Sequence, residues 1–133
     1  MIRKISQTEL DAAVKSSLQE RLQSMSGYSQ LCHGDFNPSN IIVSENGTPY
    51  ILDWSHAALG DSAADAARTC LLFGLEGSME GAQKYLELFC SRSSVAKQRI
   101  HSWLPVVAAC QSIKGNIEEK DFLLKWVNVS ANQ

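Results

Sequence analysis

The feature that most constrains the fold is a short hairpin signal near the middle of the chain. Two runs with strand character, 41–43 and 50–52, flank the dipeptide Asn46-Gly47. Asn-Gly between two apolar runs is the strongest short-range signal for a β-hairpin, because both residues tolerate the positive φ of a tight turn. The outer ends of a hairpin lie next to each other, so we expect the segments before residue 41 and after residue 52 to meet in space.

Polar residues are concentrated at those two outer ends. Asp35 and Asn40 precede the first run, and Asp53 follows the second. Mg²⁺ is commonly bound by carboxylate and amide oxygens of the protein together with phosphate oxygens of a substrate. Phosphoryl transfer needs a carboxylate that orients the attacking hydroxyl and takes its proton, and it needs metal held on the phosphate oxygens. We therefore interpret Asp35 as the candidate catalytic base, and Asn40 and Asp53 as the candidate ligands of metal and nucleotide.

The rest of the chain is dominated by helical patterns. Apolar residues recur at helical spacing over about 8–25, behind a capping box formed by Ser6 and Glu9. Four more helices are expected: one capped by Asp61 or Ser62 and reaching Gly74, one over about 79–91, one over about 94–113, and one starting at Asn116. Pro105 is expected to break or kink the third of these near Leu104. The predicted fold class is α+β, mainly helical, in a single domain over residues 1–133.

Composition excludes several other classes of protein. Of 133 residues, 44% are hydrophobic and 20% are charged, which suits one buried core and does not suit disorder. The net charge of −2 gives no reason to expect a nucleic-acid or membrane partner, and no apolar run is long enough to span a bilayer. The cysteines form no C-x-x-C pair, so we expect free thiols in a cytoplasmic protein rather than zinc ligands or disulfides; they are Cys32, Cys70, Cys90 and Cys110.

The polar segments carry a family resemblance. The spacing His33-Gly34-Asp35-x-x-x-x-Asn40, followed by Asp53-Trp54, resembles the catalytic loop and metal-binding aspartate of the aminoglycoside phosphotransferase and choline kinase-like families. These families are related to the protein kinases, which show the same spacing as H-R-D-x-x-x-x-N and D-F-G. The segment 59–67 resembles the G-D-P-x-x-D-L-A segment that follows in these families.

The resemblance implies a fold, an activity and roles for several residues. The fold would be the C-terminal lobe of a protein-kinase-like enzyme, with the hairpin carrying the catalytic and metal-binding loops. The activity would be Mg²⁺- and ATP-dependent transfer of a γ-phosphate to a hydroxyl of a small molecule. Asp35 would be catalytic, Asn40 and Asp53 would hold the metal, and His33 and Asp65 would support the catalytic loop, Asp65 through backbone hydrogen bonds.

This sequence departs from the family pattern in three ways. Asn37 stands where many members carry histidine, and Ser62 stands where many carry proline. No glycine-rich loop follows a strand, and neither Lys4 nor Lys15 lies in a V-A-I-K-like strand, so the nucleotide-covering N-terminal lobe is not represented in these residues.

Two other functions remain open at this point. The chain could be a non-catalytic remnant or binding module, which would cover the apolar surface of its lobe interface by self-association or with a partner lobe. It could also be a metal-dependent phosphohydrolase that uses His33, Asp35, Asp53 and His56, although Asn40 and Asp65 would then have no role.

Overall fold

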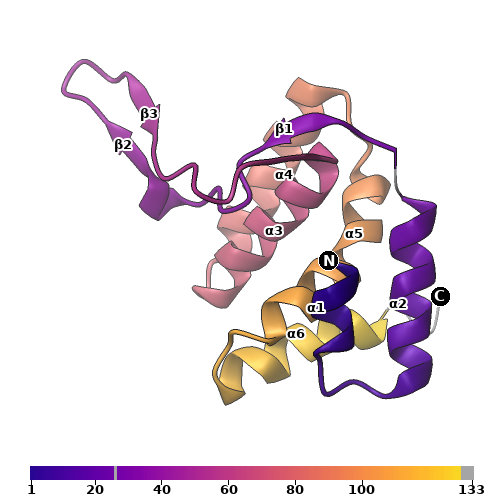
Figure 1. The fold of residues 1–133 in the computed structure, drawn as a ribbon. Coiled ribbons are helices and arrows are strands. Elements are labelled where there is room, and N and C mark those ends of the chain that lie inside the picture. The colour runs from indigo at the N-terminus through magenta and orange to yellow at the C-terminus, as the bar shows by residue number, and fades with distance from the viewer. Residues whose placement is uncertain (26, 130–133) are drawn as a thin grey trace.

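The fold is organised around one buried helix, α5 (Lys97–Ser112), in a computed structural model that describes residues 1–25 and 27–129. Every residue from Trp103 to Cys110 is buried, and a helix that is apolar on all sides needs other elements on all sides. Helices α3 (Ser62–Leu75) and α6 (Ile117–Val129) pack closely on it. Three other helices also contact it: α1 (Ile2–Ser6), α2 (Ala12–Ser24) and α4 (Met79–Ser93). In Figure 1 this helical body forms most of the molecule.

Pro105 does not end this helix, contrary to our expectation. α5 continues through it from Lys97 to Ser112. A proline inside a helix costs about 3 kcal/mol, because it removes one backbone hydrogen bond and crowds the preceding turn. Its neighbours Leu104 and Val106 are buried against the surrounding helices, so tertiary packing outweighs the local cost.

The remaining helices begin where capping residues predict. Asp61 precedes α3 and its carboxylate accepts a hydrogen bond from the Ala63 amide at 2.9 Å. Asn116 does the same before α6, accepting from the Glu119 amide at 2.9 Å. The predicted helices after the hairpin are thus confirmed to within a few residues at their ends. In the described part of the chain, no helix is both long enough and apolar enough to cross a membrane.

The helix predicted over about 8–25 is present, but it begins later than predicted, and a short helix before it was not predicted. The chain forms α1 (Ile2–Ser6), turns, and begins again as α2 (Ala12–Ser24). The cap of α2 is Asp11, which accepts from the Val14 amide at 2.9 Å, so the predicted capping box does not start this helix. Ile5 of α1 is fully buried in the core, and this burial favours a separate first turn over one continuous helix.

Two small antiparallel sheets position the polar residues. The predicted hairpin is confirmed: β2 (Ile41–Val43) pairs with β3 (Pro49–Ile51), with Ile41 opposite Ile51. A second pair, β1 (Gln30–Cys32) with β4 (Ala58–Gly60), was not predicted because no tight turn joins its strands, which lie far apart in the sequence. Figure 1 shows the hairpin reaching outward from the helices, whereas β1 and β4 lie beside α3 and α4. The segments at the root of the hairpin, 33–40 and 52–57, therefore lie between the two sheets.

We expect the central helix to dominate stability. Ile100 of α5 is 0% exposed, so Ile100→Ala leaves a cavity and should lower the free energy of unfolding by about 2–5 kcal/mol. The matched control is Ile117→Ala at an 80% exposed position, which should change it by less than about 0.5 kcal/mol. Urea unfolding followed by circular dichroism measures both, and equal losses in the two variants would contradict the assigned core.

Candidate active site

The loop 33–36 is held by a single carboxylate of α3. Asp65 accepts hydrogen bonds from the His33 amide at 2.8 Å and from the Gly34 amide at 2.9 Å, one on each oxygen. Buried amides that lose their partner cost about 1–3 kcal/mol each, so this carboxylate fixes where the loop runs. It comes from the first turn of α3, which is itself packed on the core helix α5.

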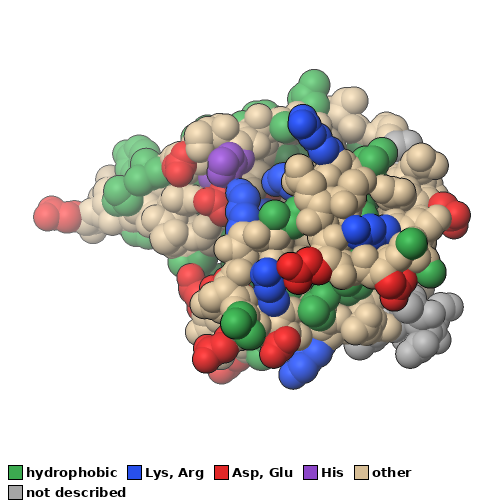
Figure 2. All heavy atoms as spheres, turned by 60° about the horizontal axis from the view of Figure 1, so that its bottom comes forward, with side chains coloured by type: hydrophobic (Ala, Val, Ile, Leu, Met, Phe, Trp, Pro, Cys, Tyr) green, Lys and Arg blue, Asp and Glu red, His purple; other side chains and the backbone are tan. Residues whose placement is uncertain are grey.

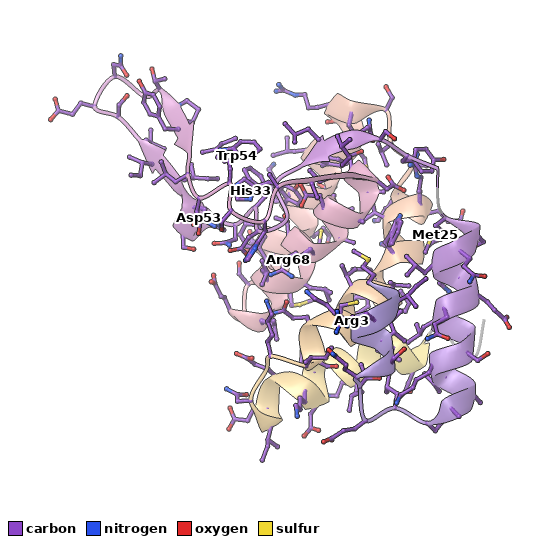
Figure 3. The ribbon with its side chains drawn as sticks, viewed as in Figure 1. Arg3, Met25, His33, Asp53, Trp54 and Arg68 are labelled. Atoms are coloured by element: carbon purple, nitrogen blue, oxygen red, sulfur yellow. The ribbon has the colours of Figure 1, made fainter. Side chains whose placement is uncertain are left out.

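The His33 ring ties this loop to the exit of the hairpin. Its Nδ1 accepts from the Asp35 amide at 3.1 Å, so its Nε2 carries the hydrogen and donates to the Leu52 carbonyl at 2.8 Å. The ring is 4% exposed and lies 4.6 Å from the ring of Trp54, centroid to centroid. Figure 3 shows His33 beside Trp54, with Asp53 close by. The histidine therefore serves here as a structural link between the loop and the residue before Asp53.

Glycine at position 34 is required by a close approach. Gly34 has φ +84°, and a Cβ there would lie 2.5 Å from the carbonyl oxygen of His56. Positive φ alone is costly for other residues, and contact with backbone cannot be relieved by rotating a side chain. The loop 33–36 and the segment after Asp53 thus approach each other closely at this glycine.

Asp35 lies in the middle of a set of side-chain donors. The Asn40 amide nitrogen is 3.2 Å from Asp35 Oδ2 and 2.9 Å from the Asp35 carbonyl oxygen. Asn37 also donates, at 3.3 Å to Asp35 Oδ1 and 3.0 Å to the carbonyl. The Asp35 side chain is 27% exposed, so one face of it remains open to a reactant. The neutral side-chain amides of Asn37 and Asn40 thus hold the carboxylate without blocking it.

Asp53 lies next to this loop in an unusual backbone conformation. The Leu52 amide bonds to the Asn40 carbonyl at 2.8 Å, which brings the neighbouring Asp53 to the same end of the hairpin. Asp53 has φ +54°, a left-handed conformation that is uncommon outside glycine and is concentrated at functional sites. The hydroxyl of Ser55, 2.6 Å from Oδ1, together with its amide, lowers the pKa of the Asp53 carboxyl. The exposed side chain is therefore ionised at neutral pH.

Two further residues of α3 contact the loop, and the sequence did not reveal them. Arg68 Nη2 lies 3.3 Å from Asp35 Oδ1, and Arg68 Nη1 donates to Gln111 on α5 at 2.9 Å. The Thr69 hydroxyl donates to the Phe36 carbonyl at 2.6 Å. Both follow Asp65 by three and four positions, which is the spacing of one helix face. That spacing was the available signal, because any polar residue there faces the same loop as Asp65.

The donor set fits a magnesium ion shared with phosphates better than a fully protein-bound metal. Within residues 1–25 and 27–129, no three His, Cys, Asp or Glu side chains are grouped to hold an ion. Asn40 and Asp53 offer one amide and one ionised carboxylate at adjacent positions. Mg²⁺ is commonly held by one or two such groups and completes its shell with water and substrate phosphates.

Comparison with known proteins places this site in a family. The model of the phosphotransferase enzyme family, APH, matches residues 3–105, so the chain belongs to that family. Choline kinase LicA from Streptococcus pneumoniae is similar in structure, with a TM-score of 0.70 at 19% identity over 96% of this chain and 54% of that one. A thermostable mutant of aminoglycoside phosphotransferase APH(4)-Ia, in a ternary complex with AMP-PNP and hygromycin B, gives 0.58 at 20% identity, over 90% and 44%.

These relatives are longer than this chain. Uncharacterized protein YcbJ of Bacillus subtilis (strain 168) is 39% identical over 49 residues, 36% of this chain and 16% of that protein. The chain spans about half the length of the solved structures it resembles. Its fold is that of the C-terminal lobe of a protein-kinase-like phosphotransferase, as the sequence predicted.

Substituting Asp65 tests how the loop is held. Asp65→Asn keeps the shape but replaces one acceptor with an N–H group, so one of the two loop amides loses its partner. We expect faster hydrogen exchange at His33 and Gly34 and a loss of about 1–3 kcal/mol in the free energy of unfolding. Asp121→Asn, at an exposed position of α6, is the control. Unchanged exchange at both amides would refute the role of Asp65.

The bond from Ser55 gives a second prediction. It favours the ionised form of Asp53, so its effect is present at neutral pH and is lost as pH falls through the lowered pKa. Ser55→Ala should therefore raise the pKa of Asp53 toward its ordinary value, as measured by carboxyl ¹³C chemical shifts against pH. Ser91→Ala on α4 should leave that pKa unchanged. A pKa that stays low in Ser55→Ala would contradict this cause.

Proposed function

We propose that residues 1–133 form one domain, the catalytic lobe of a phosphotransferase that moves the γ-phosphate of ATP, or of another nucleoside triphosphate, to a hydroxyl of a small molecule. The observation that carries the proposal is the gathering of Asp35, Asn40 and Asp53 at the two ends of one hairpin. Membership of the phosphotransferase enzyme family supports the reaction class.

Asp35 is the proposed catalytic base. Its carboxylate is fixed by donors from Asn37, Asn40 and Arg68, and its open face is available to an acceptor hydroxyl. A carboxylate so placed orients the hydroxyl and accepts its proton as the bond to phosphorus forms. His33 and Asp65 are proposed to act by positioning Asp35, because they fix the backbone on which it lies.

Asn40 and Asp53 are the proposed ligands of Mg²⁺ and, through it, of the nucleotide. The metal ion, when bound, neutralises charge on the phosphate oxygens. The low pKa of Asp53 supports this role, because the carboxylate needs no deprotonation before it binds. Solved structures of relatives contain AMP or AMP-PNP, which supports nucleotide as the donor.

An exposed apolar surface adds a further requirement to this proposal. Exposed apolar side chains occur on the hairpin and on the β1–β4 pair, namely Leu31, Ile42, Val43, Tyr50, Ile51 and Leu59. Such a surface is typical of a face covered by another lobe or chain. We propose that a nucleotide-covering lobe, or a second copy, contacts this surface, and that the protein works in the cytoplasm, where ATP is available and its four free cysteines stay reduced.

The same exposed residues favour a second candidate function, a binding module that associates through this surface without catalysis. Sedimentation velocity distinguishes self-association from a monomer, and the following two experiments decide whether the site is also catalytic.

Asp35→Asn should abolish phosphoryl transfer by the protein that carries this lobe. General-base catalysis is worth about 10²–10⁴-fold, so we expect the rate to fall by at least about 100-fold. Acceptor phosphorylation is followed by ³¹P NMR with Mg²⁺-ATP and a panel of hydroxyl compounds. Asp121→Asn should retain the full rate. Full activity in Asp35→Asn would refute the proposed base.

Metal binding tests the other half of the site. Mn²⁺ is a paramagnetic substitute for Mg²⁺, and its binding is measured by electron paramagnetic resonance in the presence of AMP-PNP. Asp53→Asn should weaken this binding by about tenfold or more, because it removes the only charged ligand proposed, whereas Asp121→Asn should not. Equal affinity in Asp53→Asn and wild type would place the metal elsewhere.

A further inference from the structure

A pocket of about 770 Å³ opens beside the catalytic loop, between α1, β4, α3 and α5. Its volume is in the range that holds a small-molecule substrate. The pocket reaches Gly34, next to Asp35, and it reaches Arg68, whose guanidinium is 3.3 Å from the Asp35 carboxylate. A molecule seated there would therefore present one end to the proposed base.

The charged side chains around this pocket are mostly basic. Four cationic residues line it: Arg3, Lys4, Arg68 and Lys114. Figure 3 shows Arg3 on α1 and Arg68 on α3 on the same side of the molecule, below His33 and Asp53. Figure 2 shows basic side chains gathered near a histidine at the base of the projecting hairpin.

The two acidic residues that line the pocket are already engaged. Asp65 uses both oxygens on the loop amides. Asp61 is 5% exposed, caps α3, pairs with Arg99 at 2.6 Å and accepts from the Trp103 indole at 2.8 Å. Neither carboxylate is therefore available to bind a cationic ligand.

The basic residues at the rim are available. Arg3, Lys4 and Lys114 are exposed, and none of them forms an ion pair within residues 1–25 and 27–129. Cys110 also lines the pocket: burial raises the pKa of its thiol, and the positive charges of the amino group of Met1, Lys4 and Arg68 oppose that rise. The positive charges thus face a common space.

This charge pattern discriminates between acceptor classes. An amino sugar or a quaternary amine brings positive charge, which needs carboxylates or open aromatic faces for binding. A phosphate or carboxylate is bound by arginine and lysine, with arginine able to donate two parallel hydrogen bonds. The pocket supplies the second chemistry and lacks free groups for the first in its described lining.

We propose that the acceptor of this phosphotransferase is a hydroxylated small molecule that carries an anionic group, a phosphate or a carboxylate, bound by Arg3, Lys4 and Lys114 while its hydroxyl faces Asp35. This inference rests on the proposed function for the identity of the ligand as acceptor. The anion-binding pocket itself is a property of the chain and is measured without any phosphoryl transfer.

The test uses four ligands that share one sugar skeleton and differ in charge: glucose 6-phosphate, gluconate, glucose and glucosamine. Isothermal titration of the chain, without nucleotide and at low salt, should give the tightest binding for glucose 6-phosphate, then gluconate, with glucosamine weakest. Affinity for the two anions should fall as salt is raised, because the rim charges are exposed.

Charge-reversal variants locate the binding. The double variant Arg3→Glu, Lys114→Glu should weaken glucose 6-phosphate by about tenfold or more, since two nearby charges change sign. The matched control, Lys84→Glu, Lys125→Glu, makes the same charge change at exposed positions of α4 and α6, away from the pocket, and should shift affinity less than threefold. Circular dichroism confirms that both doubles keep the wild-type fold.

The outcomes separate this inference from the proposed function. Tighter binding of glucosamine, equal weakening by both double variants, or no binding of any of the four ligands overturns the anionic pocket. Anion binding that responds to Arg3 and Lys114, combined with an unaffected transfer rate in Asp35→Asn, overturns the proposed catalytic role and leaves the pocket standing.

Discussion

The candidate site depends on the hydrogen bonds that side chains on one face of α3 make with the loop 33–36. The loop 33–36 forms no regular ladder with a strand, so its N–H and C=O groups need side-chain partners. Asp65, Arg68 and Thr69, on successive positions of that face, supply partners for the loop from His33 to Phe36. Because α3 is packed against α5, the core fixes the position of the loop. The His33 ring, through its hydrogen bond to the Leu52 carbonyl, fixes the end of the hairpin relative to the loop.

Local chemistry was enough to predict the hairpin, most helix ends and the residues at the root of the hairpin, because Asn46-Gly47, the helix caps and the spacing of the polar residues act within a few positions. The break at Pro105 was predicted wrongly because burial of α5 outweighs the local cost of proline, and the start of the helix at residue 8 was predicted wrongly because Asp11 caps it. The helical spacing from Asp65 could have placed Arg68 on the face toward the loop, but its partner Asp35 lies 33 residues away. The basic pocket lay beyond prediction, because only the packing of α1, α3 and α5 forms it.

The positive φ of Asp53 places local strain where the proposed chemistry occurs, and the close approach of Gly34 to His56 leaves no room there for a larger residue. Strain of this kind persists only where the surroundings fix the backbone strongly. Here the fixing contacts come from both sides, from α3 beneath the loop and from the ladder that begins at Asn40 and Leu52. The hairpin beyond that ladder projects away from the helices, and its apolar side chains are exposed (Figure 1).

The exposed positions of Arg3, Lys4 and Lys114 have a consequence for how this lobe diversifies. These side chains support no part of the core, whereas Asp65, Arg68 and Gly34 are fixed by several contacts at once. Substitutions at the rim should therefore change the charge of the pocket at little cost in stability. The proposed chemical step and the proposed choice of acceptor thus depend on separate residues, so one is open to change while the other is preserved.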